Sequence, residues 1–185
     1  MNKLILASGS PRRKELLEMA GFDFEVVKSG ADETLPRGMR PADAVKYLSK
    51  LKAFDVLDMK GSGYTVLGSD TVVSIDDKIL GKPKDEDDAK SMLEMLSGKT
   101  HSVYTGVTIC SNEKSETFSV RSDVTFFDLT KEEIENYIKT KEPMDKAGAY
   151  GIQGKGSLLV KSVSGDFFNI VGLPISLVYR RLKAF

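Results

Sequence analysis

Residues 4–17 read LILASGSPRRKELL, and the rest of the chain is organised around this stretch. Its apolar start predicts a buried strand, which breaks at a Ser-Gly pair. A helix then begins with Ser10 as its N-cap and Pro11 in its first position. Gly21 predicts the end of that helix. The chain therefore opens with a strand–loop–helix unit.

Two cations stand where a helix disfavours them. Arg12 and Arg13 occupy the first turn, whose dipole is already positive, and each is opposed by about 0.3–1 kcal/mol. A bound anion would reverse this penalty. The free backbone N–H groups, the hydroxyls of Ser8 and Ser10 and the two guanidinium groups could together hold a phosphate. The alternative is a surface turn whose arginines face water.

Composition limits the classes of function. The 185 residues carry 27 basic and 27 acidic side chains, so no net field attracts nucleic acid or an anionic membrane, and any anion site is local. The single cysteine, Cys110, excludes an internal disulfide and a multi-cysteine zinc site. It lies in a predicted strand, where we expect it to be buried. No apolar run is long enough for a membrane span or a signal peptide, so we expect a cytoplasmic protein.

Two features follow the first helix. Residues 22–27 predict a strand, and a loop after it carries Asp32 and Glu33, which could bind a divalent cation or be solvated turn residues. A helix from Pro41 to about Met59 places Lys52 within an apolar stripe. That lysine either extends past its neighbours to water or points into a cleft that holds an anion.

A carboxylate interrupts the next β-rich segment. Residues 64–75 read as two apolar runs joined by Gly-Ser-Asp, and an aspartate there is costly unless it is paired, coordinated or exposed in a cleft. Asp70 is therefore our candidate general base or metal ligand. Gly68 predicts a bulge or a close backbone approach. After a turn at residues 76–77, Lys82 lies between a glycine and a proline, which restrict its backbone.

The second half predicts alternating helices and strands. Asp85 caps a helix, and the lone histidine, His101, fits a structural role better than a metal site. Strands are predicted at 101–110, 116–129 and 157–163, and a capping box at Thr130–Glu133 begins a further helix. Residues 141–156 hold four glycines within nine residues and are either a loop fitted around a ligand or a flexible connector. An amphipathic helix ends the chain.

These pieces suit a nucleoside triphosphate with a divalent cation, because constrained cations could bind phosphates and carboxylates could bind metal and water. Walker A, Rossmann, nucleophile-elbow and protein-kinase signatures are absent from the sequence. We predict one α/β domain over residues 1–185. It has a mixed, twisted sheet with helices on both faces, and two lobes around a cleft where the N-terminal and glycine-rich loops converge.

The whole chain resembles the Maf family of nucleotide pyrophosphatases, whose fold is similar to that of inosine triphosphatases. Six blocks carry the resemblance, and they occur in the family's order. They are Ser8-Gly9-Ser10-Pro11-Arg12-Arg13, Asp32-Glu33-Thr34, Gly68-Ser69-Asp70-Thr71, Gly81-Lys82-Pro83, residues 141–154 (KEPMDKAGAYGIQG) and Gly172-Leu173-Pro174.

The resemblance implies hydrolysis of a nucleoside triphosphate between its α and β phosphates, with Mg²⁺ or Mn²⁺ as cofactor. It implies that Asp70 accepts a proton from water and that Glu33 and Asp70 serve the metal. It further implies homodimers that act on a small molecule, without nucleic acid or membrane. The residues that it places along the phosphates are Ser8, Arg13, Lys52 and Lys82.

The branch of the family is also indicated. Arg12, Thr71 and Gln153 match the branch that resembles dTTP/UTP pyrophosphatases, whereas the branch that favours 7-methyl-GTP has an aromatic residue, Gln and Glu there. An amide at Gln153 could pair with O4 and N3–H of uracil or thymine. Two alternatives remain: a non-catalytic nucleotide sensor that regulates cell division, and a metal-dependent phosphomonoesterase that releases orthophosphate.

Overall fold

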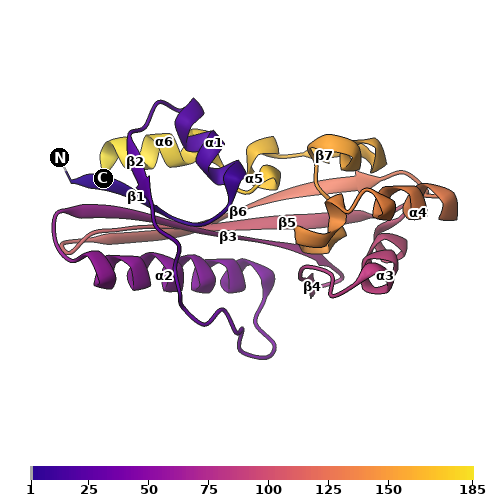
Figure 1. The fold of residues 1–185 in the computed structure, drawn as a ribbon, viewed down its shortest axis with the longest axis horizontal. Helices are drawn as coiled ribbons and strands as arrows, with labels where there is room; N and C mark the ends of the chain where they lie inside the picture. The colour runs from indigo at the N-terminus through magenta and orange to yellow at the C-terminus, as the bar shows by residue number, and fades with distance from the viewer. Residues whose placement is uncertain (1) are drawn as a thin grey trace.

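The computed structural model describes residues 2–185, which form one seven-stranded sheet with helices on both faces (Figure 1). Three short 3₁₀ turns, η1–η3, follow the fourth helix. The elements in chain order are β1 (Lys3–Ala7), α1 (Pro11–Met19), β2 (Phe24–Val26), α2 (Pro41–Lys60), β3 (Tyr64–Ile75), β4 (Lys78–Leu80), α3 (Glu86–Leu96), β5 (Thr100–Cys110), β6 (Ser115–Phe126), α4 (Lys131–Lys139), η1 (Glu142–Asp145), η2 (Ala147–Ala149), η3 (Gly154–Leu159), β7 (Val160–Ser164), α5 (Phe167–Val171) and α6 (Ile175–Ala184).

The sheet is mixed, as predicted. Its strands follow the order β2-β1-β3-β5-β6-β7, and β4 pairs with β3 off this path. β1 runs parallel to both β2 and β3, whereas the remaining pairs are antiparallel. β5 covers one edge of β3 from Val66 to Ser74.

The other edge of β3 is shared between two short strands. β1 pairs with it as far as Gly68, opposite Ala7, and β4 pairs with it from Val73, opposite Leu80. Residues 69–72 therefore have a strand neighbour on one side only. We call this stretch the edge gap, and it contains Asp70. A break in pairing lets the backbone and side chains of a central strand meet a ligand.

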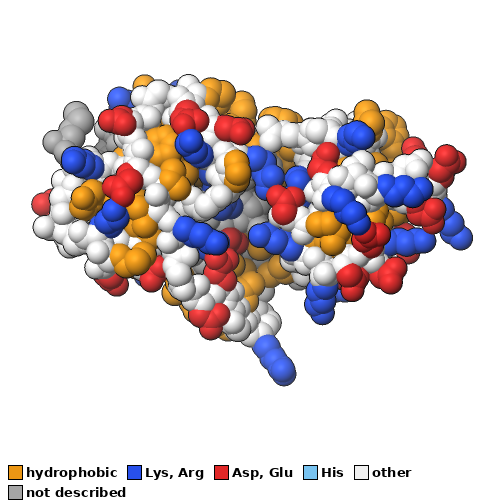
Figure 2. All heavy atoms as spheres, in the orientation of Figure 1, with side chains coloured by type: hydrophobic (Ala, Val, Ile, Leu, Met, Phe, Trp, Pro, Cys, Tyr) orange, Lys and Arg blue, Asp and Glu red, His pale blue; other side chains and the backbone are white. Residues whose placement is uncertain are grey.

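Helices cover the two faces unequally (Figure 1). α2 packs across β3 and β5 on one face, while α1 and α6 lie on the other face at the end that carries β1. At the opposite end, α3, α4 and the 3₁₀ turns form a second lobe. Figure 2 shows the surface hollowed between the lobes, with Lys and Arg side chains around the hollow.

Two glycines bring α2 close to the sheet. A Cβ atom at Gly68 would lie 2.3 Å from the carbonyl oxygen of Ser49, and one at Gly106 would lie 2.1 Å from that of Val45. Both contacts are closer than a real side chain allows. The prediction of a close approach at Gly68 is confirmed, and the register with β5 runs through it without a bulge.

The core confirms the predicted apolar faces. On α2, Val45, Leu48, Lys52 and Val56 are all buried, and the apolar faces of α3 and α4 are buried at the second lobe. Cys110 is also buried, as expected. No helix within residues 2–185 combines the length and apolar character that a bilayer crossing needs.

Several boundaries differ from the predictions. Residues 64–75 form one strand rather than two runs, because Asp70 is paired with a lysine at the edge gap and need not break the strand. The Ser10 side chain does not cap α1, although the residue is its N-cap. β7 begins at Val160 because the preceding residues form η3. The end of the chain forms two helices, since Asp166 caps α5 by accepting from the N–H of Phe168.

Candidate active site

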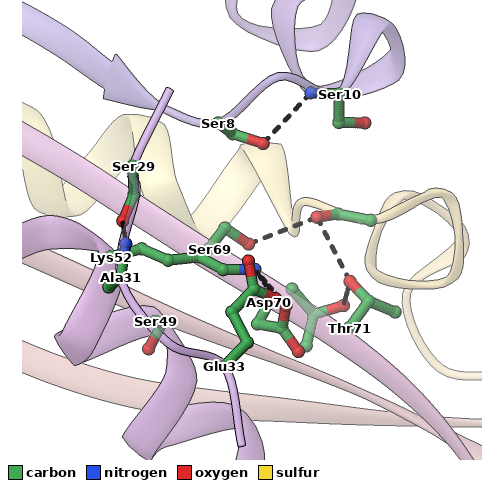
Figure 3. Close-up of polar contacts among 12 residues, drawn as sticks. Ser8, Ser10, Ser29, Ala31, Glu33, Ser49, Lys52, Ser69, Asp70 and Thr71 are labelled. Carbon is green, nitrogen blue, oxygen red and sulfur yellow. Dashed lines mark hydrogen bonds and ion pairs between the residues drawn. The ribbon is translucent and has the colours of Figure 1, made fainter. Parts of the chain in front are cut away.

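Asp70 lies in the edge gap on the face covered by α2, where Lys52 reaches it (Figure 3). The Lys52 ammonium nitrogen is 2.6 Å from Oδ1 of Asp70, and the lysine residue is only 9% exposed. The apolar stripe of α2 aims the lysine at the sheet, because its neighbours on that face are core residues. Lys52 therefore does not extend past its neighbours to water, because its ammonium group is paired within the protein.

A second carboxylate meets the same lysine. The segment between β2 and α2 crosses the sheet and places Oε2 of Glu33 2.9 Å from Nζ of Lys52 (Figures 1 and 3). Its neighbour Asp32 has other partners: its carboxylate accepts from the N–H and the hydroxyl of Thr34 within a local turn. These hydrogen bonds lower the pKa of Asp32. Only one of the two loop carboxylates thus belongs to the site.

Arg13 lies on the opposite face of β3 and donates to three partners within the protein. Its Nε donates to the carbonyl of Gly172 at 2.9 Å, Nη1 to the hydroxyl of Ser8 at 3.1 Å, and Nη2 to that of Thr71 at 3.1 Å. Burial lowers the pKa of Arg13, and the nearby charge of Asp70 opposes that shift. An arginine keeps its charge despite such a shift. Three of its five N–H groups are used, so two remain for a ligand.

The hydroxyl groups behind Arg13 form a chain of fixed direction. Thr105 donates its only hydroxyl hydrogen to the carbonyl of Asn169 at 2.8 Å. It must therefore accept from Thr71, whose oxygen lies 2.9 Å away. Thr71 in turn accepts from Arg13. The hydrogen of Thr71 is thus committed to the protein interior, and Thr71 fixes the guanidinium of Arg13.

The N-terminal and glycine-rich segments approach each other at one ion pair. Nη1 of Arg12 lies 3.8 Å from Oδ2 of Asp145, which belongs to η1. Asp145 also accepts from Nζ of Lys146 at 2.7 Å. Both arginines of the first helical turn therefore have protein partners, and the convergence of the two segments is present as predicted.

Two predicted site residues have exposed side chains that no described residue binds. Gln153 immediately precedes η3, and its amide forms no hydrogen bond within residues 2–185. Lys82 follows β4 by two residues, at the end of the edge gap that β4 bounds, and its ammonium group has no ion-pair partner in that part of the chain. The structure thus joins Glu33 to Lys52 and Asp70, and Ser8 to Arg13 and Thr71, but leaves these two side chains exposed and outside both groups.

The donor set can be tested against a divalent cation. Asp70 and Glu33 each have one oxygen on Lys52 and a second oxygen beyond it. Mg²⁺ commonly binds through one or two carboxylates together with substrate phosphates rather than in an all-protein cage. Among the described residues there is no cluster of three or more His, Cys, Asp or Glu that could hold a metal ion alone. Two carboxylates with a phosphate ligand fit this pattern.

The sequence missed three residues of this site. Gly172 accepts from Arg13, and its φ of 128° favours glycine. Its signal was its place in a motif next to Leu173 and Pro174. Asp145 lay in the glycine-rich block but had no predicted partner. Thr105 gave no signal, because a threonine within a strand is ordinary.

His101 stays outside the site, as expected. It is buried, and its Nε2 lies 2.8 Å from the hydroxyl oxygen of Tyr150. Burial lowers its pKa to about 4, while the charge of Asp123 acts weakly the other way. The histidine is therefore a neutral core residue over the physiological range.

Comparison with known proteins gives a consistent family. A family model described as Maf-like protein matches residues 3–185. A protein of Bacillus cereus (strain G9842) named dTTP/UTP pyrophosphatase is 55% identical over 185 residues, which are 100% of this chain and 96% of that relative. A protein of the same name from Bacillus thuringiensis subsp. konkukian (strain 97-27) is also 55% identical, with the same coverage.

Solved structures share the fold at low identity. A HAM1 protein from Coxiella burnetii has a TM-score of 0.54 and 13% identity, and the match covers 100% of both chains. The Ham1 protein of Staphylococcus aureus has a TM-score of 0.51 and 11% identity, and covers 68% of this chain and 72% of that chain. These likenesses confirm the α/β fold that was expected from the sequence.

Proposed function

Because the chain belongs to the Maf family, we propose that it hydrolyses nucleoside triphosphates, dTTP and UTP above others, to the monophosphate and pyrophosphate. The relatives' names support the reaction class. The observation that carries the proposal is the position of Asp70, which lies in a gap of the sheet with Lys52 beside it and Arg13 on the opposite face. A largely buried carboxylate held beside cations suits attack by water on a polyphosphate.

In this proposal Asp70 accepts the proton of a water molecule that attacks the α phosphate. Lys52 already uses its ammonium group to orient Asp70, and its remaining N–H can meet a phosphate oxygen. Arg13 supplies its two free N–H groups, held in direction by Ser8. Lys82 supplies a further cation from the rim.

Base selection is assigned to the residues at the cleft mouth. Gln153 presents one amide donor and one acceptor, which match O4 and N3–H of thymine and uracil. Arg12, on α1, is assigned with it and pairs with Asp145 of the glycine-rich segment. Thr71 acts on phosphate binding instead, because it fixes Arg13 and its own hydroxyl hydrogen is directed to Thr105.

Glu33 and Asp70 are the residues that would hold Mg²⁺ or Mn²⁺, together with phosphate oxygens of the substrate. The bound cation would neutralise phosphate charge and orient the α phosphate. Residues 1–185 form a single catalytic domain in this proposal. In this proposal the enzyme acts in the cytoplasm as a homodimer, and it binds neither nucleic acid nor a membrane.

The decisive experiment measures which ion leaves. Purified protein is incubated with dTTP and Mg²⁺, and pyrophosphate and orthophosphate are assayed separately without added pyrophosphatase. We expect dTMP and pyrophosphate in equal amounts. Orthophosphate as the first product would replace the proposal with phosphomonoesterase activity, and binding of dTTP without either ion would replace it with nucleotide sensing.

A further inference from the structure

The carboxylate of Glu142 holds the segment that carries Gln153. Its Oε1 accepts from the N–H of Gly156 at 3.1 Å, and its Oε2 accepts from the N–H of Lys155 at 3.0 Å. The hydroxyl of Tyr137 donates to the same carboxylate at 3.0 Å and accepts from the N–H of Gly151 at 3.1 Å. Glu142 and Tyr137, which we call the carboxylate clamp, thus bind both ends of residues 151–156.

This segment wraps closely around the clamp. A Cβ atom at Gly156 would lie 2.6 Å from the hydroxyl oxygen of Tyr137, and one at Gly154 would lie 2.9 Å from Oε2 of Glu142. Gly154 also has a φ of +69°, which disfavours other residues. The glycines of the block therefore serve the clamp. Because both ends of residues 151–156 are bound, the backbone at Gln153 is held in one conformation.

The clamp is charged and anchored in the core. Tyr137 is 4% exposed and comes from α4, so the core fixes the position of its ring. Burial acts to raise the pKa of Glu142, but the hydrogen bonds from Gly156, Lys155 and Tyr137 outweigh it, and the net pKa lies below its usual value. A charged carboxylate makes stronger hydrogen bonds to N–H groups than a neutral acceptor does.

We propose that Glu142 and Tyr137 are positioning residues for base selection: they orient Gln153 toward the nucleobase without contacting the substrate. The inference rests on the proposed function, in which Gln153 pairs with the edge of thymine or uracil. Loss of the clamp should then weaken recognition of that edge. It should leave the hydrolytic step at Asp70 unchanged, because Asp70 lies on β3 and is held by Lys52.

The test compares dTTP with dCTP, which has the same sugar, triphosphate and ring size but a reversed donor–acceptor edge. For Tyr137→Phe we expect kcat/KM for dTTP to fall about five- to tenfold, mostly through KM, as for loss of one positioned hydrogen bond. The value for dCTP should stay within about twofold. Tyr150→Phe is the matched control, because its buried hydroxyl meets His101 and not the segment. It should leave the dTTP/dCTP ratio unchanged.

A second substitution asks whether the effect passes through Gln153. Gln153→Ala should lower the dTTP/dCTP ratio by itself, and adding Tyr137→Phe should lower it no further. The inference is overturned if Tyr137→Phe leaves the ratio intact, if Tyr150→Phe changes it equally, or if the two effects multiply.

Amide hydrogen exchange gives a readout that does not depend on activity. Tyr137→Phe and Glu142→Gln should both lose protection at Gly151, Lys155 and Gly156, while the α4 amides stay protected. Unchanged protection would overturn the clamp itself. If wild type releases no pyrophosphate from dTTP, the proposed function fails. The exchange result then still decides whether the clamp exists.

Discussion

The ammonium group of Lys52 lies between two carboxylates, 2.6 Å from Asp70 and 2.9 Å from Glu33. It connects the loop before α2 with the central strand β3 through one ion pair to each. Two of its three N–H groups are used, so the third can meet a phosphate without breaking either pair. Lys52 can therefore bind the general base, Asp70, and a phosphate of the substrate at the same time.

Asp70→Asn tests whether Asp70 is the general base that accepts the proton of water. The amide keeps the size of the side chain and a hydrogen bond to Lys52, but it cannot accept a proton from water. We expect kcat for dTTP to fall about 10²- to 10⁴-fold with an unchanged far-ultraviolet circular dichroism spectrum. Asp123→Asn is the control, since Asp123 is also an ion-paired strand aspartate, bound to Arg121 far from the gap. Wild-type turnover in Asp70→Asn would remove Asp70 from the chemistry.

Removal of divalent cations tests the role given to Glu33 and Asp70. With dTTP as substrate, excess EDTA should abolish pyrophosphate release, and added Mg²⁺ or Mn²⁺ should restore it. Glu33→Gln should raise the Mg²⁺ concentration needed for half-maximal rate several-fold, because one of two carboxylate ligands is lost. Full activity in the chelator would show that the reaction needs no added metal.

The directed chain from Arg13 through Thr71 to Thr105 predicts matched behaviour at two residues that are far apart in the sequence but adjacent in the sheet. Thr71→Val and Thr105→Val should each raise KM for dTTP and dCTP alike, because both loosen an arginine assigned to the phosphates. Each should also cost about 1–3 kcal/mol of unfolding free energy, for a buried polar group left unpaired. Urea unfolding and steady-state kinetics measure the two effects. A dTTP-selective loss in Thr71→Val alone would mean that Thr71 touches the base.

The fold could be predicted because local signals agreed with one another. The apolar stripe of α2, the capping box of α4 and the glycine at position 68 each have a local physical cause that the structure repeats. Asp70 was found for the same reason: a carboxylate within an apolar strand conflicts with its surroundings unless something pairs with it.

The contacts between segments that are far apart in the sequence could not be read in this way. One partner of Arg13 is a backbone carbonyl, that of Gly172, and a carbonyl has no residue-type signal. The carboxylate clamp on residues 151–156 could not be predicted either. In the sequence, Glu142 resembles an ordinary surface residue after a helix, and Tyr137 resembles an ordinary core residue of that helix. Such contacts depend on how distant segments meet.

Gln153→Glu tests which edge of the base is read. A carboxylate has two acceptors and no donor, so it cannot pair with both O4 and N3–H of thymine. We expect kcat/KM for dTTP and UTP to fall about tenfold or more. The ratio of kcat/KM for dTTP to kcat/KM for 7-methyl-GTP should fall as well. Gln153→Asn, which keeps the amide on a shorter side chain, separates donor loss from reach. An unchanged ratio in Gln153→Glu would show that Gln153 does not select the nucleobase.

His101 should make stability depend on pH in a defined window. Its folded pKa is about 4, mainly because burial disfavours the charged ring, whereas the ordinary value is 6.5. Between these values the unfolded chain binds a proton that the folded chain does not, so stability falls as pH drops from about 6.5 and levels off below about 4. The shift corresponds to about 3 kcal/mol in total.

Urea unfolding at pH 7 and pH 4.5 should therefore show wild type losing roughly 2 to 3 kcal/mol more unfolding free energy than His101→Gln, which has no group titrating at position 101. Carboxylates titrate in both proteins and cancel in the difference. Equal losses in the two would mean that the buried ring accepts its proton without cost, and that the pairing of His101 with Tyr150 does not require the neutral form.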